Sequence, residues 1–534
     1  MGRYEPDVQS TYVSPRYAHR PTHDAGSRHP VIVVGAGMVG LTAALDLAQR
    51  GHRVGVLDDD DTVSVGSRAI CFAKRTLEIY GRLGLGAKAL AKGVTWNVGK
   101  VFFQDRKVYE FDLLPEPGHE YPAFVNLQQY YIEQWLVEAC QATGLVDLRW
   151  RNRLVGVENH ADGATVEVET PDGRHTLRAD WLLACDGARS FVRECLALPF
   201  VGKVFRDRFL IADVVMKADF PAERWFWFDP PFHRGGSVLL HRQADDVYRI
   251  DFQLGWDADP EAEKDPARVT ARVREMLGPD KPFELEWVSV YTFRCRRLER
   301  FRHGRTLFLG DSAHQVSPFG ARGGNGGAQD ADNLAWKLAA VLDGTAPEAL
   351  IDSYDAERIP AADENILNST RSTDFITPKN AAARAYRDAV LELAEHHAFA
   401  RPLVNSGRLS RPAVSRDSVL NTPDDAVWEG GVPPGAPAID ARLGDGWLLR
   451  ELRHDFALLL FGDAKDFPDA PLAGLRCVRV PLEAADAMRR YAARRGNVAL
   501  IRPDQHVAAR WRRFDAAAIR AARDRALGYG DMAA

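Results

Sequence analysis

The sequence predicts an α/β protein of two or three domains, built around a mostly parallel, doubly wound sheet. Three observations predict this fold class. At 534 residues the chain is too long for a single hydrophobic core. Three apolar strands each end in a glycine-containing loop: Val31–Val34 ends in a glycine-rich turn, and Trp181–Cys185 and Thr306–Leu309 end in loops that pair glycine with an acid. Between the second and third of these strands, an aromatic, strand-rich segment over 204–294 predicts an inserted antiparallel sheet.

The first strand runs directly into a glycine-rich turn. Gly35, Gly37 and Gly40 form Gly-x-Gly-x-x-Gly, and the segment Leu41–Ala48 that follows has helical spacing. Gly35 permits a tight turn, Gly37 lets a pyrophosphate approach the backbone, and Gly40 lets helix and strand pack closely. The helix N-terminus offers free N–H groups and a positive dipole end to phosphates. The turn therefore predicts dinucleotide binding, without distinguishing NAD from FAD.

An acid follows the next strand of this unit. The strand Arg53–Leu57 ends at Asp58, where a carboxylate can accept hydrogen bonds from a ribose. A Gly-x-Gly-x-x-Gly alone is weak evidence, but the order strand, glycine turn, helix, strand and acid is a specific signal. We therefore include Asp58 in the predicted cofactor site.

Bulk properties exclude several classes of function. The formal net charge of -5 provides no basic footprint for nucleic acid. No run of about 18 apolar residues predicts a membrane span, and the first 29 residues lack the apolar core of a secretory signal. The six cysteines are scattered and form no C-x-x-C, so we expect no disulfide, no metal site and a cytoplasmic protein.

Composition and strand patterns divide the chain further. Residues 98–112 are expected to form a strand pair, and four short strands are expected over 147–178 before the parallel sheet resumes at Trp181. Residues 411–435 are rich in Pro, Gly and Asp and predict a linker. The expected domains are an N-terminal arm (1–29), a cofactor domain in two parts (30–200 and 301–410, the latter with following helices), an inserted substrate-binding sheet domain (201–300), and a small C-terminal α/β domain (436–534) with strands at 456–462, 477–480 and 498–503.

Glycine–acid pairs also follow the other two buried strands. Asp186-Gly187 comes after Trp181–Cys185, and Gly310-Asp311 comes after Thr306–Leu309. In an open parallel sheet, ligands gather at the carboxyl ends of the strands. All three loops are therefore expected to converge on one cofactor.

With these motifs in this order, the chain resembles the class A FAD-dependent aromatic hydroxylases, the single-component flavoprotein monooxygenases of the para-hydroxybenzoate hydroxylase type. Within that family it is most similar to the phenol and 3-(3-hydroxyphenyl)propionate hydroxylase branch, whose members carry a C-terminal thioredoxin-like domain. The motifs cover roughly residues 30–400. The C-terminal domain matches by strand pattern alone.

The resemblance implies a role for each matching residue. Those at the FAD phosphates and adenosine ribose are the three loop glycines and Asp58, which stands where the family has Glu. Arg68 and Gln129 match residues on the phosphate and ribityl side of the flavin, and Asp186 and Gly187 match the Asp-Gly motif. Gly310 and Asp311 match the Gly-Asp motif, whose acid holds the ribityl chain. The loop under the flavin ring is matched by Pro318, Gly323, Gly324 and Asn325.

Elementary physics supports the position of that last loop. A helix N-terminus near residues 324–328 would direct its dipole toward the flavin and stabilise the negative charge that develops on reduction. The sequence contains no second strand–Gly-x-Gly-x-x-Gly–helix unit. NAD(P)H is therefore expected to bind transiently as a co-substrate, as it does in this family, and the sequence does not choose between NADH and NADPH.

The implied reaction uses NAD(P)H to reduce FAD and O₂ to form a flavin C4a-hydroperoxide, which hydroxylates an electron-rich aromatic ring. His241, Tyr248 and Arg249, on the inserted sheet, are the candidate catalytic residues. His241 or a tyrosine could draw the phenol proton, and the sequence does not decide between them. An arginine such as Arg249 in the pocket would favour a carboxylated substrate.

Several alternatives stay open. The chain could be a flavin oxidase or reductase without oxygen transfer, a hydroxylase of a polycyclic aromatic polyketide, or a non-catalytic FAD-binding protein. The expected partners are a small aromatic substrate and O₂, with no nucleic acid or membrane, and a homodimer is possible. Aromatic catabolism is the expected context.

Overall fold

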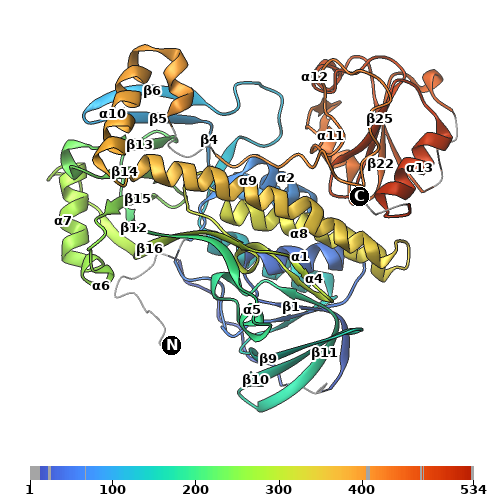
Figure 1. Ribbon diagram of the computed structural model, residues 1–534, viewed down its shortest axis with the longest axis horizontal. Helices are drawn as coiled ribbons and strands as arrows, with labels where there is room; N and C mark the ends of the chain where they lie inside the picture. Colours follow the sequence, from blue (N-terminus) through green and yellow to red (C-terminus); the bar gives the residue numbers. More distant parts are fainter. Residues whose placement is uncertain are drawn as a thin grey trace.

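The computed structural model describes residues 12–21, 26–66, 68–404, 409–468, 472 and 474–530. Part of the predicted N-terminal arm, residues 1–11 and 22–25, lies outside the described residues. Figure 1 shows a central α/β body, a second sheet beside it and a small C-terminal body on the opposite side, with the long helix α9 (Asp352–Ile376) running across the molecule.

The central body is built on a sheet with the strand order β17-β18-β11-β1-β2-β8. From β18 to β8 the strands that follow one another in this order pair in parallel. Val31–Val34 of β1, Trp181–Ala184 of β11 and the whole of β2 and β18 are buried. The strands of this sheet are β1 (Arg28–Val34), β2 (Val54–Leu57), β8 (Val146–Arg149), β9 (Arg153–His160), β10 (Gly163–Thr170), β11 (Gly173–Ala184), β17 (Arg302–His303) and β18 (Thr306–Phe308).

The register of this sheet brings four strand ends into one line. Val34 pairs with Leu57 on one side and with Ala184 on the other, and Ala184 pairs with Phe308. The loops that follow β1, β2, β11 and β18 therefore leave the sheet side by side, as expected for a ligand site at the carboxyl edge.

Strand β11 corrects one expectation. We expected a short strand at 174–178 and a separate strand from Trp181, but one continuous strand covers Gly173–Ala184. Its first half pairs antiparallel with β10, and its second half pairs parallel with β1 and β18. The change of partner within one strand explains why the sequence pattern changes from alternating to uniformly apolar.

Helices cover the central sheet, and α1 packs between α4 and α8. Because α1 carries several alanines and a glycine, it can lie close to both neighbours. The remaining helices of this body flank them. The bounds are α1 (Met38–Gln49), α2 (Lys74–Arg82), α3 (Gly86–Lys92), α4 (Gln129–Thr143), α5 (Phe191–Cys195), α8 (Gly323–Leu342) and α9 (Asp352–Ile376), beside the small sheet β3 (Cys71–Ala73), β7 (Phe124–Asn126) and β4 (Val94–Trp96).

The second sheet has eight strands in the order β19-β16-β12-β15-β14-β13-β5-β6. It extends beyond the expected range 201–300, because β5 and β6 come from residues 98–112 and β5 pairs in parallel with β13. The strands are β5 (Val98–Phe103), β6 (Arg106–Asp112), β12 (Phe200–Val215), β13 (Arg224–Phe228), β14 (Ser237–Arg242), β15 (Val247–Leu254), β16 (Glu284–Leu298) and β19 (His314–Gln315).

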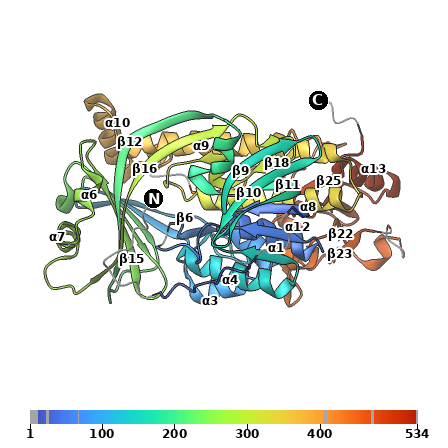
Figure 2. The ribbon, with the colours of Figure 1, turned by 90° about the horizontal axis from the view of Figure 1, so that it is seen from below.

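The two faces of the second sheet have different environments. Helix α7 (Pro266–Leu277) buries Val269, Val273 and Leu277 against the outer face, and α6 (Pro260–Glu263) lies nearby. Figure 2 shows both helices on the side away from the central body. The inner face packs against Phe319, α9 and α10 (Ala381–His396).

The C-terminal body contains a four-stranded sheet in the order β23-β22-β24-β25. β22 and β23 are parallel, and β24 is antiparallel to both of its neighbours. The fourth strand, β25, was not predicted from the sequence. The bounds are β22 (Ala457–Phe461), β23 (Arg476–Val480), β24 (Asn497–Ile501) and β25 (Val507–Trp511), with α11 (Leu448–Leu452), α12 (Ala485–Arg490), α13 (Ala516–Ala526) and the ribbon β20 (Arg442–Leu443) and β21 (Gly446–Trp447).

The described part of the N-terminal arm lies on the central body. Tyr12 stacks on Tyr130 with ring centroids 3.9 Å apart, and Tyr17 stacks on Trp150 at 4.5 Å. Within the described ranges, no helix combines the length and the apolar character needed to cross a membrane.

Candidate FAD and substrate site

The glycine turn after β1 has the geometry that a phosphate loop needs. Gly35 adopts φ +104°, and a Cβ there would lie 2.5 Å from the carbonyl oxygen of Cys185. A Cβ on Gly40 would lie 2.0 Å from the Gly35 oxygen. Gly37 differs, because the nearest atom to its Cβ position is a carboxylate oxygen of Glu133 at 3.8 Å. Packing within the protein thus requires glycine at 35 and 40, whereas the space at 37 is free for a ligand.

Asp58 closes the turn from the neighbouring strand. Its Oδ2 accepts a hydrogen bond from the Ala36 N–H at 2.6 Å, and its Oδ1 accepts one from the Asp60 N–H at 2.9 Å. Burial raises the pKa of Asp58 to about 6, although the residue keeps partial contact with solvent. Among the described residues Asp58 has no cationic partner, so its carboxylate can accept further hydrogen bonds, such as those of ribose hydroxyls.

Glu133 is a site residue that sequence reasoning missed. It is 1% exposed, and its Oε1 accepts the Met38 N–H at the start of α1 at 3.1 Å. The same side chain accepts the Ser64 N–H and hydroxyl, and the Gln129 amide donates to it at 2.6 Å. Gln129 also accepts the Ala69 N–H at 2.9 Å. The four-residue spacing of Gln129 and Glu133 on α4 was the available signal.

Arg68 lies at the edge of the site, on the segment between β2 and β3. Its positive charge opposes the upward pKa shift that burial gives to Asp311. Its carbonyl oxygen accepts a hydrogen bond from Arg249 Nη1 at 3.1 Å, which ties this segment to the second sheet. The indole ring of Trp287 packs at the α-carbon of Gly66.

The Asp186-Gly187 loop follows β11. Asp186 Oδ2 accepts the Val192 N–H at 3.0 Å, while Oδ1 is buried without a hydrogen-bond partner among the described residues. Burial raises the pKa of Asp186. Gly187 adopts φ +74° with open space around its Cβ position. An orphaned acceptor beside open space fits a ligand that donates hydrogen bonds.

Gly310 and Asp311 are positioned by the helix α8. The Gly310 N–H donates to Asp330 Oδ2 at 3.0 Å, and Asp330 also binds His314 Nε2 and Arg358 Nε, each at 2.7 Å. His314, three residues after Asp311 in sequence, therefore serves to hold α8. Burial raises the pKa of Asp311, whose side chain keeps partial solvent contact.

The loop from Pro318 leads into the N-terminus of α8, which begins at Gly323. The Cβ position of Gly323 lies 3.8 Å from Asp311 Oδ1, and a Cβ on Gly324 would lie 2.8 Å from Met38 Cε. Asn325 accepts the Ala73 N–H at 2.9 Å and donates to the Cys71 carbonyl at 2.8 Å. The free N–H groups of the first turn of α8 therefore lie beside the predicted ribityl acid.

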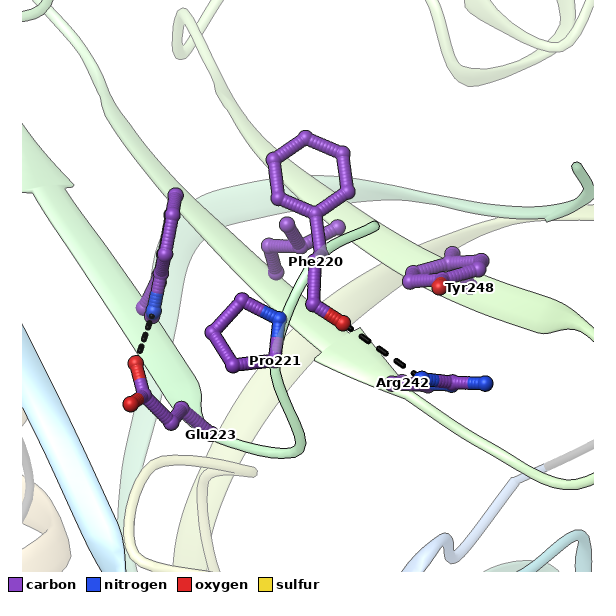
Figure 3. A pocket seen from close by; sticks show the side chains of 7 residues that line it. Phe220, Pro221, Glu223, Arg242 and Tyr248 are labelled. Atoms are coloured by element: carbon purple, nitrogen blue, oxygen red, sulfur yellow. Dashed lines mark hydrogen bonds between the residues drawn. The ribbon is translucent and has the colours of Figure 1, made fainter. Parts of the chain in front are cut away.

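The structure separates the three predicted catalytic residues. His241 pairs with Arg249 across β14 and β15, whereas Tyr248 pairs with Arg242. Because neighbouring residues on a strand point to opposite faces, Tyr248 lies on the outer face and donates to the Ala218 carbonyl at 2.8 Å. It lines the outer pocket of Figure 3 with Arg242 and Phe220, and the aromatic rings there pack on one another. Tyr248 thus cannot act together with His241 and Arg249.

His241 and Arg249 lie on the inner face but have other roles than expected. Arg249 binds Asp213 through Nε at 2.8 Å and Nη2 at 3.1 Å, so its guanidinium is engaged within the protein. His241 is buried between the charges of Arg224 and Arg249, and its pKa is therefore well below the ordinary value. Arg249 is poorly placed to select a carboxylated substrate, contrary to expectation.

The residues present fit FAD. The open space at Gly37 can take phosphates. Asp58, Asp186 and Asp311, at three of the four aligned strand ends, have raised pKa values and can accept hydrogen bonds from hydroxyl groups. Asp186 also has an oxygen that is buried without a partner among the described residues. A FAD-binding flavoprotein is the class that this fold and site define.

Comparison with known proteins identifies the family. Residues 28–369 match the model of the FAD binding domain family. The chain is 30% identical over 495 residues to a flavin-dependent monooxygenase of Mycobacteroides abscessus, covering 89% of this chain and 96% of that protein. The chain therefore belongs to this family, and it is a flavin-dependent monooxygenase of the class A aromatic hydroxylase type.

Other relatives match over about two thirds of the chain. A 6-methylpretetramide 4-monooxygenase of Streptomyces rimosus is 36% identical over 368 residues, covering 66% of this chain and 63% of the relative. A 3-(3-hydroxy-phenyl)propionate/3-hydroxycinnamic acid hydroxylase of Mycolicibacterium smegmatis is 30% identical over 369 residues, covering 68% and 64%. The fold is similar to that of the flavin-dependent monooxygenase PieE, with a TM-score of 0.79, 22% identity and coverage of 94% and 99%.

Proposed function

We propose that this monooxygenase uses NAD(P)H and O₂ to hydroxylate a phenolic or other electron-rich aromatic ring. The observation that carries the proposal is the alignment of four strand ends, with Asp58, Asp186 and Asp311 beside the Gly37 cradle, opposite a buried sheet face that carries His241. FAD, when bound, would supply the redox and oxygen chemistry. The two relatives named for a hydroxyphenyl acid and for 6-methylpretetramide support an aromatic substrate.

The chain's own residues would bind FAD, orient the substrate ring and exclude water from it. The glycine turn and the start of α1 would hold the phosphates, and Asp58 and Asp311 would accept hydrogen bonds from hydroxyl groups of FAD. The first turn of α8 would stabilise negative charge on the flavin. The second sheet would cover the ring and exclude water. This division assigns residues 30–200 and 301–410 to the FAD domain and the second sheet to the substrate.

The C-terminal body is proposed to be a thioredoxin-like domain. Its strand order and the antiparallel third strand of four support this assignment. Residues 436–534 contain one cysteine, Cys477, so a thiol–disulfide exchange is not part of the proposal.

A hydroxylated polycyclic product is the second candidate, and the identity to the 6-methylpretetramide 4-monooxygenase favours it. One assay separates the candidates. Purified, FAD-loaded protein is given NADH or NADPH with phenol, 4-nitrophenol, 3-(3-hydroxyphenyl)propionate or a hydroxyanthraquinone, and NAD(P)H consumption, product mass and peroxide are measured together. We expect one ring class to stimulate consumption and to gain one oxygen atom. Peroxide without hydroxylated product would indicate an oxidase, and no stimulation by any phenol would contradict the proposal.

A further inference from the structure

The inner face of the second sheet presents a row of ionisable side chains to the FAD domain. Arg224, His241 and Arg249 are direct neighbours across β13, β14 and β15. Asp251 lies two residues beyond Arg249 on β15, and residues two apart on a strand share a face. Asp251 therefore lies on the same face as His241, in the neighbouring cross-strand row, where it pairs with Leu239.

This face lies at the junction with the FAD domain. The Cys71 sulfur is 3.9 Å from His241 Nδ1, and Arg249 donates to the Arg68 carbonyl at 3.1 Å. Cys71 is bound in turn to Asn325 at the start of α8. The row thus faces the segments that carry Arg68 and the predicted flavin loop.

Asp251 has an available acceptor. Its Oδ1 is buried and has no hydrogen-bond partner within the described ranges, while the rest of the side chain keeps partial contact with solvent. This combination is typical of the wall of a concave site. A buried acceptor left without a donor is costly, so its presence calls for a functional explanation.

The surrounding charges adjust the basicity of Asp251. Burial, the largest cause, raises the pKa of Asp251 to about 7, and Asp213 on β12 acts in the same direction. Arg249 on the same strand and Arg224 on β13 oppose the increase. Cys71, on the facing strand, has its pKa raised to about 12 by burial and is therefore an uncharged thiol.

We propose that the carboxylate of Asp251 receives the proton of the substrate's phenolic hydroxyl group. The O–H bond of the phenol breaks, its electron pair stays on the phenolate oxygen, and the proton forms a new O–H bond with Asp251. The phenolate is the more electron-rich ring for oxygen transfer. The inference rests on the proposed function and replaces His241 and Tyr248 as candidate bases. A base that works near neutral pH needs a pKa near that pH, and this condition disfavours His241.

The test uses the FAD-loaded full chain as wild type, Asp251→Asn and Asp251→Glu, with the phenol that most stimulates the wild type. The wild-type kcat/KM for hydroxylated product is expected to rise with pH through about 7, because the carboxylate accepts a proton only when it is ionised. In Asp251→Asn this rise of kcat/KM with pH is expected to disappear, and kcat/KM at pH 7.5 is expected to be about 100-fold lower than in the wild type. Asp251→Glu is expected to keep the rise.

A second readout separates proton transfer from a structural role. For 4-nitrophenol, which ionises more readily than phenol in solution, the loss in Asp251→Asn is expected to shrink as the pH rises and the phenolate forms without a base. FAD content and thermal unfolding are measured for each variant. An unchanged pH profile in Asp251→Asn, or an equal loss for both phenols at every pH, would overturn the inference. If the wild type hydroxylates no phenol, the proposed function fails, and this failure is visible before any variant is compared.

Discussion

Burial raises the pKa of Asp58, the carboxylate that we propose accepts hydrogen bonds from FAD. Its pKa is raised from 3.8 to about 6, so the folded apoprotein gains stability from the protonated form below pH 4 and loses that stability as the pH rises through 6. In the role proposed for Asp58, FAD would bind better to the ionised form, because an ionised carboxylate is the better acceptor for ribose hydroxyls. FAD affinity is therefore expected to increase as the pH rises through about 6.

Asp58→Asn is expected to remove this pH step and to weaken FAD binding about tenfold at pH 8, the equivalent of roughly 1.4 kcal/mol for a hydrogen bond to a charged group. Quenching of flavin fluorescence measures both effects. Asp59→Asn is the matched control, because Asp59 is exposed and only its charge acts on Asp58. This control should keep the step with a slightly lower midpoint. A pH-independent FAD affinity in the wild type would refute the role of Asp58.

Among the elements, the turn between β1 and α1 contains two glycines that packing within the protein requires, Gly35 and Gly40, and one, Gly37, that we propose contacts the ligand. Gly37→Ala adds a methyl group at a helix N-cap with φ -80°, where no protein atom lies closer than 3.8 Å. The free energy of unfolding of the apoprotein is expected to lie within about 0.5 kcal/mol of the wild-type value. FAD binding is expected to weaken about 10-fold or more, because the methyl group occupies the space of the phosphates.

Gly40→Ala is the contrasting variant. Its Cβ would lie 2.0 Å from the Gly35 oxygen, so the strand and the helix must move apart. This change is expected to lower the free energy of unfolding by about 1–3 kcal/mol or more. Thermal unfolding of the apoproteins and FAD titration distinguish the two glycines. Equal FAD affinity in Gly37→Ala and the wild type would remove this explanation of the turn.

Local patterns predicted the elements whose signal lies within a few residues. The glycine turn, Asp58 and the two glycine–acid loops all follow buried strands, and the structure places them at one sheet edge. Strand alternation already contained the information that Tyr248 and Arg249 face opposite ways. The roles of Glu133 and Asp330 depend on contacts with distant backbone N–H groups, Met38 and Gly310, which no local pattern records.

The pairing of β5 with β13 was also beyond local reasoning. The two strands are more than 100 residues apart in sequence, and β5 pairs in parallel with β13 although most of the sheet is antiparallel. The sequence predicted that residues 98–112 would form strands, but no local pattern indicated which sheet these strands join. Partner choice depends on packing of the whole sheet face, here around Phe226 and Phe103.

Across the whole molecule, the C-terminal body meets the FAD domain through buried charges. Arg502 binds Glu357 of α9 at 2.6 Å and Asp504 at 2.8 Å, and all three side chains are at most 1% exposed. Lys337 of α8 also binds Glu357, at 2.8 Å. A second contact joins Arg75 of α2 to the Asp504 carbonyl at 2.6 Å and to Asp332 of α8 at 3.1 Å.

We expect this network to help position α8, because Asp332 and Lys337 of that helix take part in it. α8 begins beside Asp311, and its Asp330 holds the Gly310 N–H, so a displaced α8 would disturb the predicted flavin site. Buried ion pairs add little net stability compared with apolar packing, but removing one partner leaves an uncompensated buried charge. The C-terminal body is therefore expected to affect FAD retention without contacting FAD.

Arg502→Met tests this coupling between the two bodies. The variant leaves Glu357 and Asp504 without their shared cation, so unfolding is expected to become easier by about 3–5 kcal/mol, with loss of FAD on gel filtration. Arg495→Met is the matched control, because Arg495 pairs with Asp463 on the surface of the same domain and its loss should cost less than about 1 kcal/mol. Adding Glu357→Gln to Arg502→Met restores the balance of charge in this cluster, which then holds one cation, Lys337, and one anion, Asp504. The double variant should therefore cost less than the sum of the two single changes. If Arg502→Met instead unfolds like Arg495→Met and retains its flavin, the buried network does not position α8, and the C-terminal body is attached without influence on the cofactor site.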